Sequence, residues 1–155
     1  MGEELYASEI LEFGLKNIDH FAGVYALDQL PVGETPLLAP FTLVANVQPA
    51  NLPGLHWIAV WVNAHLEGEI FDPLGLVAPD EVRQWLREQQ GVRGRVARSY
   101  TMVQHPRSSV CGHFALYYCA RRPLCTSLAA FFSHFLSPSL ARNYSIVKEF
   151  YQTHK

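Results

Sequence analysis

This chain contains a histidine, an aspartate, a glutamine and a cysteine that together could hydrolyse a peptide bond. His56 comes first, Asp72 follows it, and Gln104 precedes Cys111 by seven residues. A thiol hydrolase needs a nucleophile, a base, a group that orients the base and a donor that stabilises the oxyanion. The four residues supply one of each, so a cysteine protease is the leading hypothesis.

Cys111 opens an apolar stretch, Phe114 to Ala120, that is typical of a buried helix. A thiol at a helix N-terminus is deprotonated more readily, because free N–H groups and the macrodipole stabilise the thiolate. We expect Ser108 or Ser109 to cap this helix. We also expect that Gly112, which has no side chain, lets a substrate backbone approach closely.

The other two cysteines fit a purely structural role. Cys119 lies inside the aromatic helix and Cys125 follows a proline–leucine turn, and burial as a free thiol is the commoner fate of cysteine. A zinc site is the rival use of these residues. However, the cysteines are separated by seven and five residues, without the two-to-four-residue spacing that zinc ligands favour. No phosphate-binding or dinucleotide fingerprint is present, so neither a metal nor a cofactor is predicted.

Seven histidines compete for the role of base. His113 lies two residues beyond the cysteine and points to another face of its helix, and nothing near His105 would orient its ring. His56 begins an apolar strand and Asp72 ends a later one, so pairing of the strands would bring both side chains together. The carboxylate would then fix the imidazole tautomer and favour the imidazolium. Alone, Asp72 would be only a turn residue before a proline.

Gln104 follows a predicted strand over 95–103. Its side-chain N–H could pair with the backbone N–H of Cys111 to form an oxyanion hole, in which losing one donor typically lowers the rate by about 10²–10³. A glutamine at a strand end is ordinarily just solvated, so this assignment depends on the other three residues.

Periodicity and turn residues predict an α+β chain with a central mixed, mainly antiparallel sheet flanked by helices. The predicted strands are 41–47, 56–62, 69–71 and 95–103, with a hairpin connection over 63–68 and only short extended pieces around 21–25. The predicted helices are 3–15, with Tyr6, Ile10, Leu11 and Leu15 on one face; one from Pro79 that Gly91 stops; one from Cys111 that Pro123 ends; one from Thr126 through Leu136; and one from Ser137 through Tyr151.

Composition predicts a single globular domain over residues 1–155, with 49% hydrophobic and 17% charged residues. A net charge of −2 gives no electrostatic reason to expect a nucleic acid or membrane partner. The acidic N-terminus does not resemble a signal peptide, and no apolar run reaches the roughly 18–20 residues of a membrane span. Three cysteines without framework spacing suit a reducing compartment. Cytoplasm, nucleus and virion interior are all compatible with this. We also expect a monomer that is not secreted.

Several segments together resemble the adenovirus protease family, adenain, in the clan that also includes SUMO-specific proteases. Its nucleophile comes last in the chain, whereas in papain-type enzymes the cysteine comes first. Val110 favours the adenain branch, because SUMO proteases usually have an acidic residue before Cys-Gly. The matching segments are Phe21-x-Gly23-x-Tyr25 with Leu30-Pro31, Leu43-Val-Ala-Asn46, Leu55-His56-Trp57-x-Ala59, Phe71-Asp72-Pro73-Leu74-Gly75 with Asp for the adenoviral Glu, and Gln104 with Ser109-Val-Cys111-Gly112-x-Phe114.

The resemblance implies an adenain-like fold and an endopeptidase that cuts viral capsid or core precursors near small, glycine-containing sites, in a narrow groove flanked by Trp57 and Cys111. Adenoviral enzymes are longer, basic, stimulated by DNA and activated by a peptide disulfide-linked to a cysteine between the acidic residue and the glutamine. No cysteine lies between Asp72 and Gln104 here. We therefore expect neither a disulfide-linked activator nor a requirement for nucleic acid, and a peptide activator bound without a disulfide stays open.

Two alternatives use the same residues. One is an isopeptidase that removes ubiquitin or SUMO after Gly-Gly, and the other is a non-catalytic virion interaction module that keeps the fold.

Overall fold

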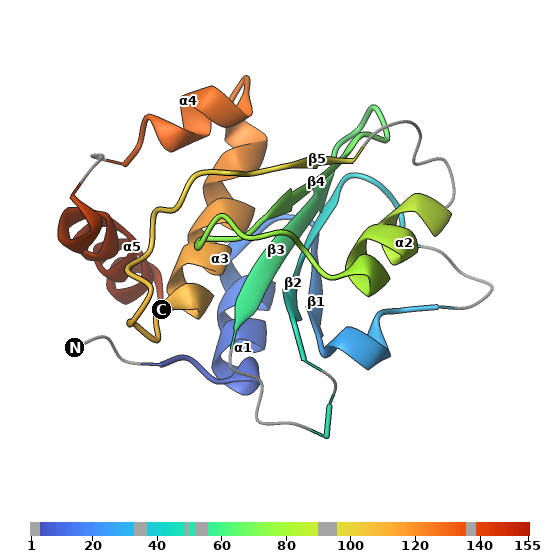
Figure 1. Ribbon diagram of the computed structural model, residues 1–155, viewed down its shortest axis with the longest axis horizontal. Coiled ribbons are helices and arrows are strands. Elements are labelled where there is room, and N and C mark those ends of the chain that lie inside the picture. Colours follow the sequence, from blue (N-terminus) through green and yellow to red (C-terminus); the bar gives the residue numbers. More distant parts are fainter. Residues whose placement is uncertain (1–3, 33–36, 49, 52–55, 90–95, 136–138) are drawn as a thin grey trace.

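The computed structural model describes residues 4–32, 37–48, 50–51, 56–89, 96–135 and 139–155. Among them, five strands form one mixed sheet whose spatial order follows the sequence, β1-β2-β3-β4-β5 (Figure 1). The central pairs β2–β3 and β3–β4 are antiparallel, and the outer pairs β1–β2 and β4–β5 are parallel. The mixed sheet of the predicted α+β class is therefore observed. The strands are β1 (Phe21–Tyr25), β2 (Phe41–Asn46), β3 (Trp57–Val62), β4 (Gly68–Phe71) and β5 (Ala97–Arg98).

Helices cover both faces of this sheet. Three of them, α1, α3 and α5, gather on one face, and α2 lies on the other (Figure 1). No helix in the described part of the chain is long and apolar enough to cross a membrane. The helices are α1 (Ala7–Asn17), α2 (Asp80–Glu88), α3 (Cys111–Arg121), α4 (Leu128–Phe132) and α5 (Leu140–His154), with 3-10 turns at Leu27–Gln29 and Arg122–Leu124.

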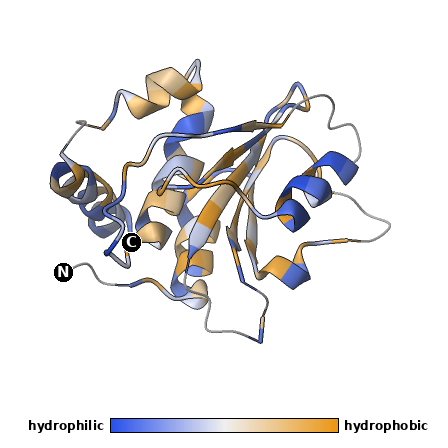
Figure 2. Cartoon of the chain, viewed as in Figure 1, coloured by the Kyte–Doolittle hydropathy of each residue, from blue (hydrophilic) through white to orange (hydrophobic). Residues whose placement is uncertain are grey.

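The alternation of β3 divides the core into two layers. Trp57 and Ala59 face α3, whereas Ile58, Val60 and Val62 face α2, because successive side chains of a strand point to opposite faces. The helix α3 is buried almost all round, which explains its nearly continuous apolar sequence. By contrast, α2 is largely hydrophilic in Figure 2, and its buried residues are Val82, Trp85 and Leu86.

A buried ion pair joins the sheet to the segment after α3. Arg122 donates from Nε to Glu69 Oε2 at 2.8 Å and from Nη2 to Oε1 at 3.0 Å. The Tyr118 hydroxyl donates to the same carboxylate, and the Arg122 guanidinium stacks over the Trp61 ring. The bidentate geometry satisfies both carboxylate oxygens inside the core.

The N-terminal part of the chain differs from the sequence prediction. Residues 21–25 form β1 rather than isolated extended pieces, because they pair in parallel with β2, a partner too far along the chain for local periodicity to reveal. The helix α1 begins at Ala7 rather than at residue 3, and it buries Ile10, Phe13 and Gly14. The predicted face is wrong here, since Leu15 is 64% exposed while Gly14 packs against the Phe21 ring.

The predicted strand over 95–103 is much shorter in the structure. Within the described residues 96–103, only Ala97 and Arg98 pair with β4, and Ser99 adds a last backbone bond to Ile70. The ladder ends there because β4 ends at Phe71 and the following turn takes the chain away. Residues 90–95, which include the predicted stop at Gly91, lie outside the described residues.

One helix begins at a different residue from that predicted, and the start of another can be compared only in part. The Ser127 hydroxyl accepts from Ala130 N at 3.0 Å, so α4 starts at Leu128 rather than at Thr126 and is only one turn long. Ser139 caps α5; the predicted boundaries at 136–138 lie outside the described residues.

Candidate active site

The ends of β3 and β4 bring a histidine and an aspartate together. His56 immediately precedes β3 and Asp72 immediately follows β4, and these ends are adjacent because Ala59 pairs with Phe71. The His56 Nε2 lies 2.7 Å from Asp72 Oδ1. Asp72 is 3% exposed and the His56 side chain is 15% exposed. This contact fixes which ring nitrogen faces the carboxylate.

The backbone around Asp72 fixes the orientation of its carboxylate. The Leu74 N–H donates to the same Oδ1 at 2.8 Å, and the Gly75 N–H donates to the Asp72 carbonyl at 2.8 Å. The Asp72 N–H itself donates to Ser99 Oγ at 3.2 Å. Asp72 therefore has two roles, as a turn residue and as the hydrogen-bond partner of His56. The turn orients its carboxylate toward the imidazole ring.

Cys111 is the first residue of α3, and its sulfur is held against the start of β3. The backbone N–H of Trp57 donates to Cys111 Sγ at 3.3 Å, and Cys111 is 4% exposed. A donor at this position stabilises negative charge on the sulfur. Sequence patterns do not reveal this contact, because every non-proline residue carries the same backbone N–H.

The N-terminus of α3 has no side-chain cap. Its N-cap residue is Val110, so the predicted capping by Ser108 or Ser109 is wrong. The Ser108 hydroxyl instead donates to the carbonyl of His105 at 2.8 Å. The first N–H groups of a helix have no partner inside the helix, and no side chain caps those of α3. The His113 N–H donates to the Val110 carbonyl at 3.1 Å.

The His56 imidazole connects the carboxylate and the thiol. Burial on its own lowers the pKa of His56, but hydrogen bonds with Asp72 and with Cys111, together with their charges, outweigh burial and raise the pKa to about 9. Because Nε2 faces Asp72, Nδ1 is the ring nitrogen left for the hydrogen bond with Cys111. With this pKa, the His56 ring is an imidazolium at neutral pH and places a positive charge beside the Cys111 sulfur.

Gln104 is buried at the same end of the sheet. Its backbone N–H donates to the carbonyl of Pro73 at 3.1 Å. Its Nε2 donates to the carbonyl of Ser108 at 3.2 Å and to the Ser108 hydroxyl at 3.0 Å. The structure therefore places Gln104 beside the segment that leads to Cys111, with its amide hydrogens directed at Ser108. Its role as an oxyanion donor stays a prediction.

Gly112 packs closely against the N-terminal segment of the chain itself. A Cβ atom there would lie 3.1 Å from Ile10 Cδ1 and 3.2 Å from Leu5 Cβ. The close approach that the sequence predicts for a substrate is therefore made by Leu5 and Ile10, and contact between Gly112 and a substrate stays a prediction.

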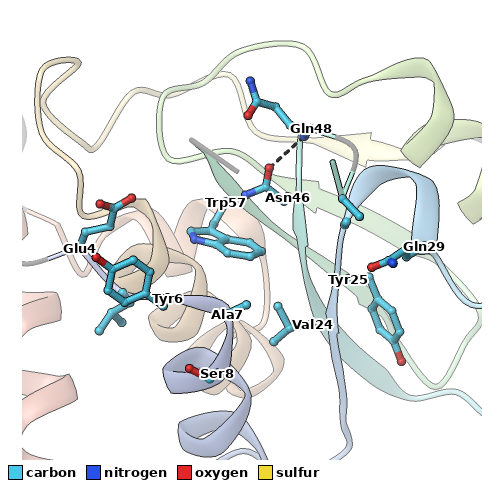
Figure 3. A pocket seen from close by; sticks show the side chains of 13 residues that line it. Glu4, Tyr6, Ala7, Ser8, Val24, Tyr25, Gln29, Asn46, Gln48 and Trp57 are labelled. Atoms are coloured by element: carbon cyan, nitrogen blue, oxygen red, sulfur yellow. Dashed lines mark hydrogen bonds between the residues drawn. The ribbon is translucent and has the colours of Figure 1, made fainter. Parts of the chain in front are cut away.

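A cavity of about 480 Å³ lies beside Trp57. Figure 3 shows the Trp57 indole between the start of α1, with Tyr6 and Ala7, and the side chains of Val24 and Asn46 from the ends of β1 and β2. The backbone N–H of Trp57 contacts the Cys111 sulfur, so the same residue lines the cavity and touches Cys111.

The remaining thiols and imidazoles have other surroundings. Burial raises the pKa of Cys119 to about 12, although a hydrogen bond with Thr42 lowers it. His113 is buried and packs edge-on against Tyr144 and Tyr151. No group of three or more His, Cys, Asp or Glu side chains in the described part of the chain could hold a metal ion.

Cys125 also lies near an imidazole, but the pair is differently supported. Its sulfur is 3.8 Å from His134 Nε2, while the other ring nitrogen contacts the Tyr117 hydroxyl at 3.1 Å. The thiol donates to the carbonyl of Arg121 at 3.3 Å. A carbonyl acceptor stabilises the neutral thiol rather than the thiolate, in contrast to the N–H donor at Cys111.

Comparison with known proteins gives a fold and no sequence family. No family model matches the chain, and no curated protein matches it. A crystal structure of the protease of African swine fever virus (ASFV) is similar with a TM-score of 0.61 and 18% identity, over 91% of this chain and 65% of that chain. A selenomethionine structure of the same protease gives a TM-score of 0.49 and 23% identity, over 67% and 42% of the two chains.

A bacterial protein has a similar fold. The central domain of the uncharacterized Lpg1148 protein from Legionella pneumophila matches with a TM-score of 0.54 and 14% identity, over 99% of this chain and 100% of that chain. The present chain spans less than two thirds of the ASFV protease chains that it matches. At these sequence identities the comparisons establish only that this chain shares its α+β fold with the ASFV protease and with the Legionella domain.

Proposed function

We propose that this chain is a cysteine endopeptidase in which Cys111 is the nucleophile, His56 carries the proton and Asp72 orients the imidazole. The observation that carries the proposal is the position of His56, which hydrogen-bonds to Asp72 at 2.7 Å and also to Cys111. The shared fold with the ASFV protease supports it.

The reaction follows from the charges in this arrangement. The Cys111 thiolate attacks the carbonyl carbon of the scissile bond, and the electron pair of that C=O moves to its oxygen. The His56 imidazolium then protonates the leaving amine as the C–N bond breaks, which leaves a thioester on Cys111. A water, deprotonated by the now neutral His56, hydrolyses the thioester and restores the thiolate–imidazolium pair.

The oxyanion needs donors in place before the charge develops. The Cys111 N–H stands at the uncapped start of α3, which suits it to this role. We assign the second donor to Gln104 Nε2, which must release one hydrogen from Ser108 to reach the oxyanion. Losing such a donor lowers the rate by about 10²–10³ in other hydrolases.

We further propose that the substrates are polypeptides with small, glycine-containing sites, and that viral precursor proteins are the natural targets. The sequence resemblance to adenain and the viral origin of the ASFV protease support this assignment. Trp57 would then form one side of the substrate groove, as its position beside the sulfur and the cavity suggests.

The test is cleavage of a peptide library by wild-type protein, by Cys111→Ala and by the matched control Cys125→Ala. We expect the wild type and Cys125→Ala to cut the same peptides and Cys111→Ala to cut none. Cleavage that persists in Cys111→Ala would contradict the assignment. Labelling of Cys111 by ubiquitin or SUMO C-terminal electrophiles would instead indicate the isopeptidase alternative.

A further inference from the structure

Asn46 presents an unused hydrogen-bond donor at the cavity beside Trp57. It is the last residue of β2, it pairs with Trp57 across the sheet, and it is only 2% exposed. Its Nδ2 is buried and has no hydrogen-bond partner in the described part of the chain. A buried donor without an acceptor is destabilising, so this group needs an explanation.

The orientation of the Asn46 amide is fixed by the backbone. The Gln48 N–H donates to Asn46 Oδ1 at 2.9 Å, and Figure 3 shows this bond. Because a backbone N–H can only donate, the atom that faces Gln48 must be the oxygen. The two Nδ2 hydrogens therefore point away from Gln48, and Asn46 is one of the residues that line the cavity.

The lining of the cavity indicates what kind of acceptor it would take. Among the described residues that line it, Glu4 is the single charged one, and none is a cation. A carboxylate or phosphate would therefore meet a negative charge without a compensating positive one. A neutral carbonyl oxygen fits instead, and Val24, Ala7 and the Trp57 indole give it apolar surroundings.

The position of the cavity indicates which molecule brings this carbonyl. Trp57 lines the cavity and donates to the Cys111 sulfur, and Leu5 lines the cavity and lies against Gly112. A chain that occupies the cavity therefore lies next to the nucleophile. The leaving amine must be at His56, which protonates it, so the cavity is left for the acyl side of the substrate.

We propose that Asn46 is a substrate-binding residue whose Nδ2–H donates to a backbone carbonyl on the acyl side of the scissile bond. This inference rests on the proposed protease function and adds to it a specific contact. Through this contact the protein would recognise the backbone of the substrate rather than a side chain. Such recognition is compatible with small side chains at the cleavage site.

Peptidyl electrophiles test this contact without knowledge of the cleavage sequence. A panel of acyl-dipeptide vinyl sulfones is reacted with the full chain, and labelling of Cys111 is followed by mass spectrometry. The variant is Asn46→Asp, which keeps an oxygen for Gln48 and removes the donor. The matched control Asn51→Asp makes the same chemical change at an exposed position. Thermal unfolding shows that each variant is folded, and iodoacetamide measures the reactivity of the sulfur alone.

We expect Asn46→Asp to lower the labelling rate by the peptidyl probes about tenfold to a hundredfold, and the rate with iodoacetamide to change less than twofold. Replacing the acyl-side backbone C=O of the probe by CH₂ should cause a similar loss in the wild type and little further loss in Asn46→Asp, because the two changes remove the same hydrogen bond. Asn51→Asp should behave like the wild type.

Equal labelling of wild type and Asn46→Asp by the peptidyl probes would overturn the inference. It would also be overturned if the loss of rate from the CH₂ probe and the loss from the Asn46 substitution simply added together. If iodoacetamide reacts rapidly at Cys111 but no peptidyl probe does, the inference also fails, because the sulfur is then active without a peptide site. Slow reaction of Cys111 even with iodoacetamide would instead overturn the proposed function.

Discussion

Replacing Asp72 by asparagine should remove a measurable part of the pH dependence of folding. In the wild type, the folded-state pKa of His56 is about 9, above the ordinary value of 6.5. The imidazolium therefore stabilises the folded chain fully below about pH 6.5, and this contribution is lost as the pH rises through 9. Asp72→Asn keeps the shape of the side chain but removes the charge that faces Nε2.

The size of the effect follows from the shift in pKa. A difference of one pKa unit corresponds to about 1.36 kcal/mol, so raising the pKa from 6.5 to about 9 corresponds to about 3 kcal/mol. The His56 side chain is only 15% exposed, so solvent screens this contribution little. Asp72→Asn should lose the part due to Asp72 and keep the part due to Cys111.

Urea unfolding between pH 6 and 9.5 measures this effect, and NMR titration of His56 gives its pKa directly. Because Cys111 is present in both proteins, its own contribution largely cancels in their difference. We therefore expect Asp72→Asn to be less stable than the wild type at pH 6, by at most about 3 kcal/mol, and this difference to shrink as the pH rises to 9.5. The exposed control Asp19→Asn should follow the wild type. If Asp72→Asn shows the wild-type pH dependence and an unchanged pKa of His56, the role given to the Asp72 carboxylate is wrong.

Three further substitutions test other parts of the structure. Gln104→Ala should lower kcat by about 10²–10³, whereas Ser108→Ala should leave kcat within about threefold; equal losses in steady-state assays would show that Gln104 acts only through Ser108. Gly112→Ala should lower the unfolding free energy by about 1–3 kcal/mol, because its Cβ would meet Leu5 and Ile10; unchanged urea unfolding would contradict this packing. Glu69→Ala should lower the unfolding free energy by about 3–5 kcal/mol, because it leaves Arg122 buried and unpaired; a loss below about 1 kcal/mol would contradict the importance of this pair.

The sequence predicts the elements whose patterns are local. The strands β2 and β3 are recognisable from continuous apolar runs, and α3 from an apolar helix that follows Cys111. By contrast, β1 depends on pairing with β2, and β5 is cut short by the turn at Asp72. Neither the formation of β1 nor the length of β5 follows from the residues of the segment itself, because tertiary contacts determine both.

The site shows the same division between side-chain type and three-dimensional contact. Residue types and strand order suffice to place His56 beside Asp72, since antiparallel pairing brings their strand ends together. Two hydrogen bonds cannot be predicted from the sequence. One joins the Trp57 N–H to the Cys111 sulfur, and the other joins Gln104 Nε2 to the Ser108 hydroxyl. They depend on backbone positions and on a loop conformation for which no residue pattern exists.

The relative reactivity of the three thiols tests the central claim most directly. Cys111 is 4% exposed, whereas Cys125 is the more exposed thiol and Cys119 is fully buried. Iodoacetamide alkylation at pH 7, followed site by site by mass spectrometry, separates access from activation. We predict that Cys111 reacts fastest despite its burial, and that His56→Ala abolishes this advantage. Fastest reaction at Cys125, with no effect of His56→Ala on Cys111, would contradict a thiolate–imidazolium nucleophile at this site.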